Sequence, residues 1–133
     1  MDVKFTPSEL KEMLANYYSK RDGIESKVVV HVESNYDRYG DEECYVEFTL
    51  VRKIKLLGKE KTVSDSLSHD DVKQAIKEIF INDGYTVCSV TFDSGLKYKW
   101  EGYGIGETRV SKPYFTGVSV KIKSKEKVKK LGE

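Results

Sequence analysis

Cysteine and histidine are scarce in this chain, with two residues of each type among 133. Two cysteines cannot form a disulfide scaffold, and no short spacing brings these residues together as zinc ligands. Cys44 and Cys88 fall on the apolar faces of predicted strands, whereas His31 falls on the opposite face of its strand, so no catalytic cysteine–histidine pair is expected. We therefore predict that both cysteines are buried, that the chain uses no metal or cofactor, and that it is not an enzyme.

An excess of one charge and long apolar runs are also lacking. The 23 basic and 22 acidic residues leave a net charge of +1, so no global field directs the chain toward nucleic acid. No apolar run approaches the roughly 20 residues that span a bilayer, and the residues after Met1 lack the apolar core of a signal peptide. We expect one cytoplasmic domain over residues 1–133, with no membrane partner and a charged tail at 124–133.

A helix-start pattern, in contrast, occurs twice. Thr6 and Ser68 are N-cap hydroxyls, and a carboxylate follows each of them three residues later, at Glu9 and Asp71. Such a carboxylate can accept the amide proton of the capping residue, and it opposes the helix dipole. His69 is predicted to be exposed at the start of the second helix. Apolar residues then recur with helical spacing, at Leu10, Met13, Leu14, Tyr17 and Tyr18 and again at Val72, Ala75, Ile76, Ile79 and Phe80.

Alternating apolar residues predict two strands after each helix. In the first half, residues 28–33 and 44–54 alternate; in the second half, residues 85–92 and 114–123 do so. Each pair of runs is joined by a polar segment, which indicates an antiparallel hairpin. Residues 56–63 predict a tight turn and a short further strand that leads into the second helix.

These patterns predict an α+β fold built as a tandem αββ repeat, with units at about 5–63 and 66–123. Two amphipathic helices pack most simply on one face of a single, mainly antiparallel sheet of four to six strands. Residues 93–113 form an unusually long connection, and alternation over 97–101 indicates an extra strand within it. The glycine-rich segment 102–107 lacks the following helix of a phosphate-binding loop, so we interpret it as a turn or hinge.

Aromatic side chains concentrate in the two loops that join the paired strands. Tyr, Trp and Arg are the residue types enriched at protein-binding hot spots. We predict that these loops bind a macromolecular partner, and a protein is the favoured partner. The alternative is that some of the rings cover an open end of the core. The predicted partner-binding residues are Tyr36, Arg38, Tyr39, Tyr98, Trp100, Tyr103 and Arg109.

Basic residues form two runs that favour an alternative function. Each run lies near the end of a half of the chain, where lysines can contact nucleic-acid phosphates, although glutamates interrupt both runs. Basic edge strands also protect a sheet from aggregation. A third alternative is a small-ligand enzyme at the glycine-rich segment 102–107. The residues of the nucleic-acid alternative are Arg52, Lys53, Lys55, Lys121, Lys123 and Lys125.

Composition and face pattern add two expectations about partners. In its size, its Lys/Glu/Tyr-rich composition and its lack of motifs, the chain resembles the small accessory proteins of phages and other mobile elements in low-GC bacteria. The resemblance identifies no family, and it implies an accessory or inhibitory role. A homodimer is also favoured, because contiguous apolar faces are rarely left in water. The second face of the predicted sheet carries Val29, His31, Tyr45, Val51, Tyr85 and Val87.

Overall fold

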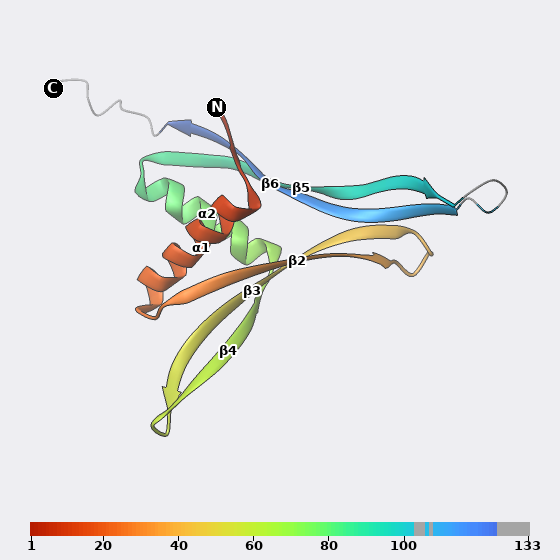
Figure 1. The fold of residues 1–133 in the computed structure, drawn as a ribbon. Helices are drawn as coiled ribbons and strands as arrows, with labels where there is room; N and C mark the ends of the chain where they lie inside the picture. Colours follow the sequence, from red (N-terminus) through yellow and green to blue (C-terminus); the bar gives the residue numbers. More distant parts are fainter. Residues whose placement is uncertain (103–105, 107, 125–133) are drawn as a thin grey trace, which may run out of the picture.

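The computed structural model describes residues 1–102, 106 and 108–124. Strands and helices follow one another along the chain with short connections (Figure 1). The elements are β1 (Asp2–Phe5), α1 (Pro7–Asp22), β2 (Ser26–Tyr36), β3 (Glu42–Leu56), β4 (Lys59–Leu67), α2 (His69–Asn82), β5 (Tyr85–Glu101) and β6 (Thr108–Ser124).

Both predicted helix starts are confirmed as complete capping boxes. The Glu9 amide donates to Thr6 Oγ1 at 3.1 Å, and the Thr6 amide donates to Glu9 Oε1 at 3.0 Å. Ser68 and Asp71 exchange the same two bonds at 3.0 Å each. The apolar stripe of each helix is buried, and its fully enclosed members are Leu10, Leu14, Tyr18, Val72, Ala75, Ile76 and Phe80.

The strands form two three-stranded antiparallel sheets, in the orders β1-β6-β5 and β2-β3-β4. The α+β class is therefore confirmed, and the prediction of a single sheet is wrong. The central strands β3 and β6 are each flanked on both sides, so neither has a free edge to join the other hairpin. The two apolar faces meet across one core instead, and the tandem αββ repeat stays a prediction.

The strand before each helix pairs with the hairpin that follows the other helix. Phe5 of β1 lies opposite Val118 of β6, and Leu67 of β4 lies opposite Phe48 of β3. The short strand β4 was expected, whereas β1 was not. A strand of four residues is too short for its alternation to be distinguished from a loop.

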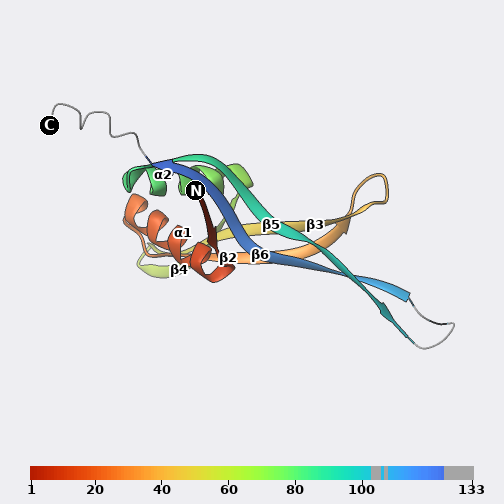
Figure 2. The ribbon, with the colours of Figure 1, turned by 90° about the horizontal axis from the view of Figure 1, so that it is seen from above.

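The helices lie between the two sheets at one end of the molecule (Figures 1 and 2). Helix α1 contacts β2 and β6, and α2 contacts β5 and β4, so each helix touches both sheets. One continuous core joins them, with Phe48 of β3 almost completely enclosed.

An aromatic cluster closes the core where the sheets approach each other beyond the helices. The ring of Phe48 lies 5.5 Å from that of Phe92 and 6.0 Å from that of Phe115. His69 is exposed, as predicted, but its ring lies 4.6 Å from Phe92 and its Nε2 donates to the Val46 carbonyl at 2.6 Å.

A register shift in β5 overturns part of the predicted face assignment. The pairing with β6 slips between Val87 and Ser89, so Cys88 is exposed rather than buried. Val87 and Tyr85 pack against the core instead of lying on the second face of the sheet. Cys44 is half-buried, with its Sγ 3.5 Å from the Tyr114 carbonyl oxygen. A bulge changes which residues face inward, and alternation alone does not reveal it.

The long connection at 93–113 is largely paired strand. β5 continues to Glu101 and β6 begins at Thr108, so residues 97–101 are strand as expected, but they continue β5 and do not form an extra strand. The predicted tail begins with Ser124, the last residue of β6, and its other residues lie outside the described part of the chain. Across the described residues, no helix is long and apolar enough to cross a membrane.

Gly117 allows β1 to dock onto β6. It is buried with a φ of 121°, and a Cβ atom at this position would overlap the Phe5 carbonyl oxygen. Gly84 also has a positive φ, of 89°, but the space around it is open. The two glycines therefore separate the cost of backbone strain from the cost of losing the β1 contact.

We expect Gly117→Ala to lower the free energy of unfolding by at least about 2 kcal/mol, because strain and overlap act together. Gly84→Ala is the matched control, and we expect it to lose only about 1 kcal/mol from strain. Urea denaturation monitored by circular dichroism measures both changes. Equal losses in the two variants would contradict a special role for Gly117.

Candidate functional site

Two hairpin arms extend beyond the helices from the same end of the molecule (Figures 1 and 2). The first arm is residues 33–44, at the β2–β3 connection, and the second arm is residues 94–102 and 108–115, on β5 and β6. The sequence alone does not show whether the two aromatic loops lie near each other. The structure brings them together, because the Ser111 hydroxyl donates to the Glu42 carboxylate and Cys44 lies against Tyr114.

The tip of the first arm is held by one carboxylate. Oδ1 of Asp37 accepts the amide protons of Tyr39 at 2.8 Å and of Asp41 at 3.0 Å. The Asp37 amide donates to the Asp41 carbonyl at 2.8 Å, and Gly40, with a φ of 82°, donates to the Asp37 carbonyl at 3.0 Å. These bonds fix the turn and leave the Tyr39 side chain pointing away from the core.

A recess of about 380 Å³ lies between the arms. The Arg109 guanidinium lies over the Tyr98 ring, 4.6 Å from its centre, on the second arm. Acidic side chains of the first arm line the same recess. The full lining is Tyr36, Gly40, Asp41 and Glu42 from the first arm and Tyr98, Arg109 and Ser111 from the second. Three predicted partner-binding residues, Tyr36, Tyr98 and Arg109, thus meet in one place.

Large aromatic side chains on both arms are exposed. The exposed fractions are 77% for Tyr39, 72% for Tyr36, 67% for Trp100 and 51% for Tyr98. Such values do not support the alternative in which these rings cover an open end of the core. Arg38 lies over the Tyr39 ring at 5.3 Å from its centre. Tyr103, which was also predicted, lies outside the described residues.

Three polar residues that line the recess were not among the predicted site residues. Ser111 carried no signal, because a serine in a strand is unremarkable until its neighbour from another hairpin is known. Asp41 and Glu42 belong to an acidic polar loop in the sequence, and nothing in the sequence alone indicates that they line a recess with the second arm. Among the described residues, no group of three or more His, Cys, Asp or Glu side chains is placed to hold a metal ion.

The basic residues of the nucleic-acid alternative are spread over the molecule. Arg52 donates to Asp22 and has a side chain only 13% exposed, while Lys53 lies 3.8 Å from Glu60. Lys121 and Lys123 are exposed on β6, on the other side of the helices from the β3–β4 turn (Figure 1). The structure therefore does not join the two runs into one surface. Lys55 is exposed on β3, and Lys125 lies outside the described part of the chain.

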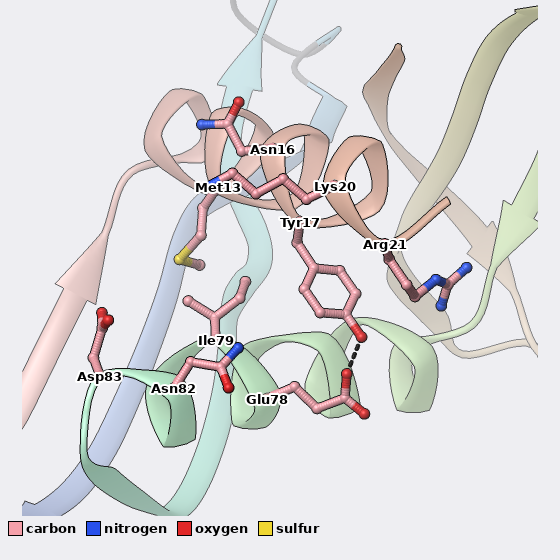
Figure 3. A pocket seen from close by; sticks show the side chains of 9 residues that line it. All are labelled: Met13, Asn16, Tyr17, Lys20, Arg21, Glu78, Ile79, Asn82 and Asp83. Atoms are coloured by element: carbon pink, nitrogen blue, oxygen red, sulfur yellow. Dashed lines mark hydrogen bonds between the residues drawn. The ribbon is translucent and has the colours of Figure 1, made fainter. Parts of the chain in front are cut away.

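A second recess, of about 610 Å³, lies between α1 and α2 (Figure 3). Met13 and Ile79 supply its apolar floor, and the Tyr17 hydroxyl donates to the Glu78 carboxylate across it. Burial, followed by the neighbouring carboxylate, raises the pKa of Tyr17, and the same hydrogen bond lowers the pKa of Glu78. This contact links the two helices, and none of the predicted site residues lies here.

Comparison with protein-family models, with curated proteins and with solved structures finds no match to this chain.

Asp22 links the end of α1 to β3 through two arginines. Arg21 donates to both of its oxygens, at 2.8 and 3.0 Å, and Arg52 donates to one of them. The bonds from Arg21, and then those from Arg52, lower the pKa of Asp22 to about 2. Since the folded-state pKa lies below the ordinary value of 3.8, ionised Asp22 stabilises the fold above that pH, and this contribution disappears as the pH falls toward 2.

We expect Asp22→Asn to destabilise the protein near neutral pH, because the largely buried Arg52 side chain loses its charged partner. The difference from the unsubstituted protein should shrink as the pH falls from about 4 to about 2. Urea midpoints across this range measure the effect, with the exposed Asp65→Asn as the control. A difference that stays constant with pH would contradict this account of Asp22.

Proposed function

We propose that this protein is a non-catalytic binding domain that captures a protein partner with its two hairpin arms. The observation that carries the proposal is the meeting of Tyr36 with Tyr98 and Arg109 at one recess, although they come from separate hairpins. Tyr39 on the first arm and Trp100 on the second are also exposed. Aromatic residues and arginine around a polar recess are typical of binding hot spots.

The size of the exposed rings makes them the main source of affinity in this proposal. A buried Trp or Tyr removes about 150–250 Å² from water. At about 25 cal/mol per Å², full burial would contribute roughly 4–6 kcal/mol before ordering costs. Trp100 and Tyr36 are each about two-thirds exposed or more, so most of that contribution is still available to a partner.

The backbone turn of the first arm is already ordered in the free protein. The bonds to Asp37 Oδ1 hold the turn that carries Tyr39, and Ser111 ties Glu42 to the second arm. A surface that is already ordered loses less conformational entropy on binding. Asp41 and Glu42 opposite Arg109 give the recess both signs of charge, which favours a peptide or protein surface with complementary charges over a polyanion.

Nucleic-acid binding is the less favoured function for two structural reasons. The most enclosed basic residue of that set, Arg52, is occupied by Asp22, and the lysines lie on separate parts of the surface. The arms themselves carry carboxylates that would repel phosphates. A steep loss of binding with rising salt would be the mark of nucleic acid.

The biological setting belongs to the same proposal. We infer an intracellular accessory or inhibitory role of the kind found in phages and mobile elements. Cys44 and Cys88 are both free thiols, as a reducing compartment would keep them. We also infer a tandem αββ repeat in which each unit supplies one arm. The matching capping boxes, and the matching pairings of Phe5 with Val118 and of Leu67 with Phe48, support it.

We expect the double variant Tyr36→Ala/Trp100→Ala to fold normally and to lose partner capture by at least about a hundredfold, because both rings are exposed and one lies on each arm. The measurement is affinity capture from a lysate with nuclease present, followed by binding titration of the captured protein.

The matched control is Val29→Ala/Ile81→Ala, which removes two apolar side chains that are 51% and 54% exposed away from the arms. It should capture the partner normally. Undiminished capture by the Tyr36→Ala/Trp100→Ala variant would contradict the proposal, and loss of all captured material with nuclease would assign the function to nucleic acid.

A further inference from the structure

The turn between β3 and β4 places a leucine in an unfavourable backbone conformation. Leu57 and Gly58 join the strands with φ values of 52° and 76°. Positive φ at both central residues is the type I′ hairpin turn, in which Asn, Asp or Gly normally occupies the first position. Within the described residues, Leu57 is the one non-glycine residue with a positive φ. A leucine at this position strains the backbone, whereas glycine or asparagine would not. Its presence therefore suggests that the leucine side chain has a role.

The same leucine has no contact with the core. Leu57 is fully exposed, and its neighbour Leu56 is 53% exposed. The turn projects away from the helices and from both arms (Figure 1). Two adjacent leucines at the end of a protruding hairpin are therefore in water in the free protein.

Lysines surround this leucine tip on both faces of the hairpin. Leu56 pairs with Lys59 and Ile54 with Lys61, so these two lysines share one face. Lys53 and Lys55 alternate with Ile54 and Leu56 along β3, which places them on the other face. All four lysines are exposed, and Glu60, beside Lys53, is the one acidic residue between positions 53 and 61.

We propose that the leucine tip, residues Leu56 and Leu57 with the four lysines around them, inserts into the surface of an anionic lipid bilayer. The leucines enter the region between headgroups and acyl chains, while the lysines remain at the level of the lipid phosphates. This contact needs no membrane-spanning segment, and it replaces the expectation from the sequence that the protein has no membrane partner. It is separate from the arms, so the protein could hold a partner and a membrane at the same time.

The arrangement of charge favours a bilayer over other anionic partners. A hairpin tip inserted into a bilayer has lipid headgroups on every side. Lysines on both faces of the hairpin can therefore all contact anionic headgroups. A nucleic-acid site would use aromatic rings to stack on bases, whereas the side chains at this tip are aliphatic. A protein pocket would need an acidic rim on all sides of an apolar hole, which is a more specialised partner.

The test uses the whole protein in co-sedimentation with vesicles of phosphatidylcholine alone and with vesicles in which one third of the lipid is phosphatidylserine. We expect binding only to the anionic vesicles and weaker binding at higher salt. Leu57→Asn should weaken it by about tenfold or more, since burial of one leucine contributes at least that factor. Because Asn tolerates a positive φ, this variant should melt at the same temperature or higher.

Controls separate the leucine tip from general stickiness. Ile81→Asn changes a half-exposed apolar residue on α2, far from the leucine tip, and should bind vesicles normally. Lys55→Glu/Lys59→Glu, which reverses one charge on each face, should abolish binding. Failure to bind anionic vesicles, or binding that Leu57→Asn leaves unchanged, would overturn the proposal. Binding of an oligonucleotide that depends on the tip, without vesicle binding, would assign these lysines to nucleic acid instead.

Discussion

The structure depends on the pairing of each pre-helix strand with the opposite hairpin. β1 lies beside β6, so one sheet joins the first residues of the chain to its second half, whereas β4 lies beside β3 in a sheet built from residues 26–67. β1 therefore cannot turn relative to the β5–β6 hairpin without breaking a ladder of backbone hydrogen bonds. Gly117 is the point at which this exchange is tightest, because the Phe5 backbone occupies the space where a side chain would lie. The helices fill the space between the sheets and complete one core.

The arms follow from this arrangement. The two sheets face each other across the helices, and both hairpins leave the core at the same end. The rings of Phe92 and Phe115, one on each strand of the second hairpin, pack against Phe48 of the first. Beyond this cluster each hairpin is a two-stranded ribbon. Ribbons of this kind are weak alone, and the contact between Ser111 and Glu42 joins them. The result is a recess lined by both halves of the chain, distant from the leucine tip on the β3–β4 turn. Two surfaces of different chemistry are thus carried on one small scaffold.

Much of the local structure could be predicted because its causes are local. Thr6 and Glu9 are three residues apart, so their reciprocal hydrogen bonds can be predicted from the sequence. The aromatic residues of the loops can be identified by counting residue types. Cys88 shows where such reasoning ends, because a bulge in β5 reverses its face. For the candidate site, Tyr36, Tyr98 and Arg109 could be proposed individually from residue type. Ser111 could not, since its role comes from a carboxylate on a different hairpin.

The amino-acid sequence by itself determined the two capped helices, the hairpins and the residues that fill the core, because hydrogen-bonding reach and apolar periodicity act over a few neighbouring positions. Only the tertiary structure decided that the strands form two sheets and that the two aromatic arms meet. Both outcomes depend on which strand edges pair with each other, as β1 pairs with β6 at Phe5 and Val118. Such pairings join residues far apart in the chain, and backbone hydrogen bonds are chemically alike in every strand, so the choice is made by packing of the whole core.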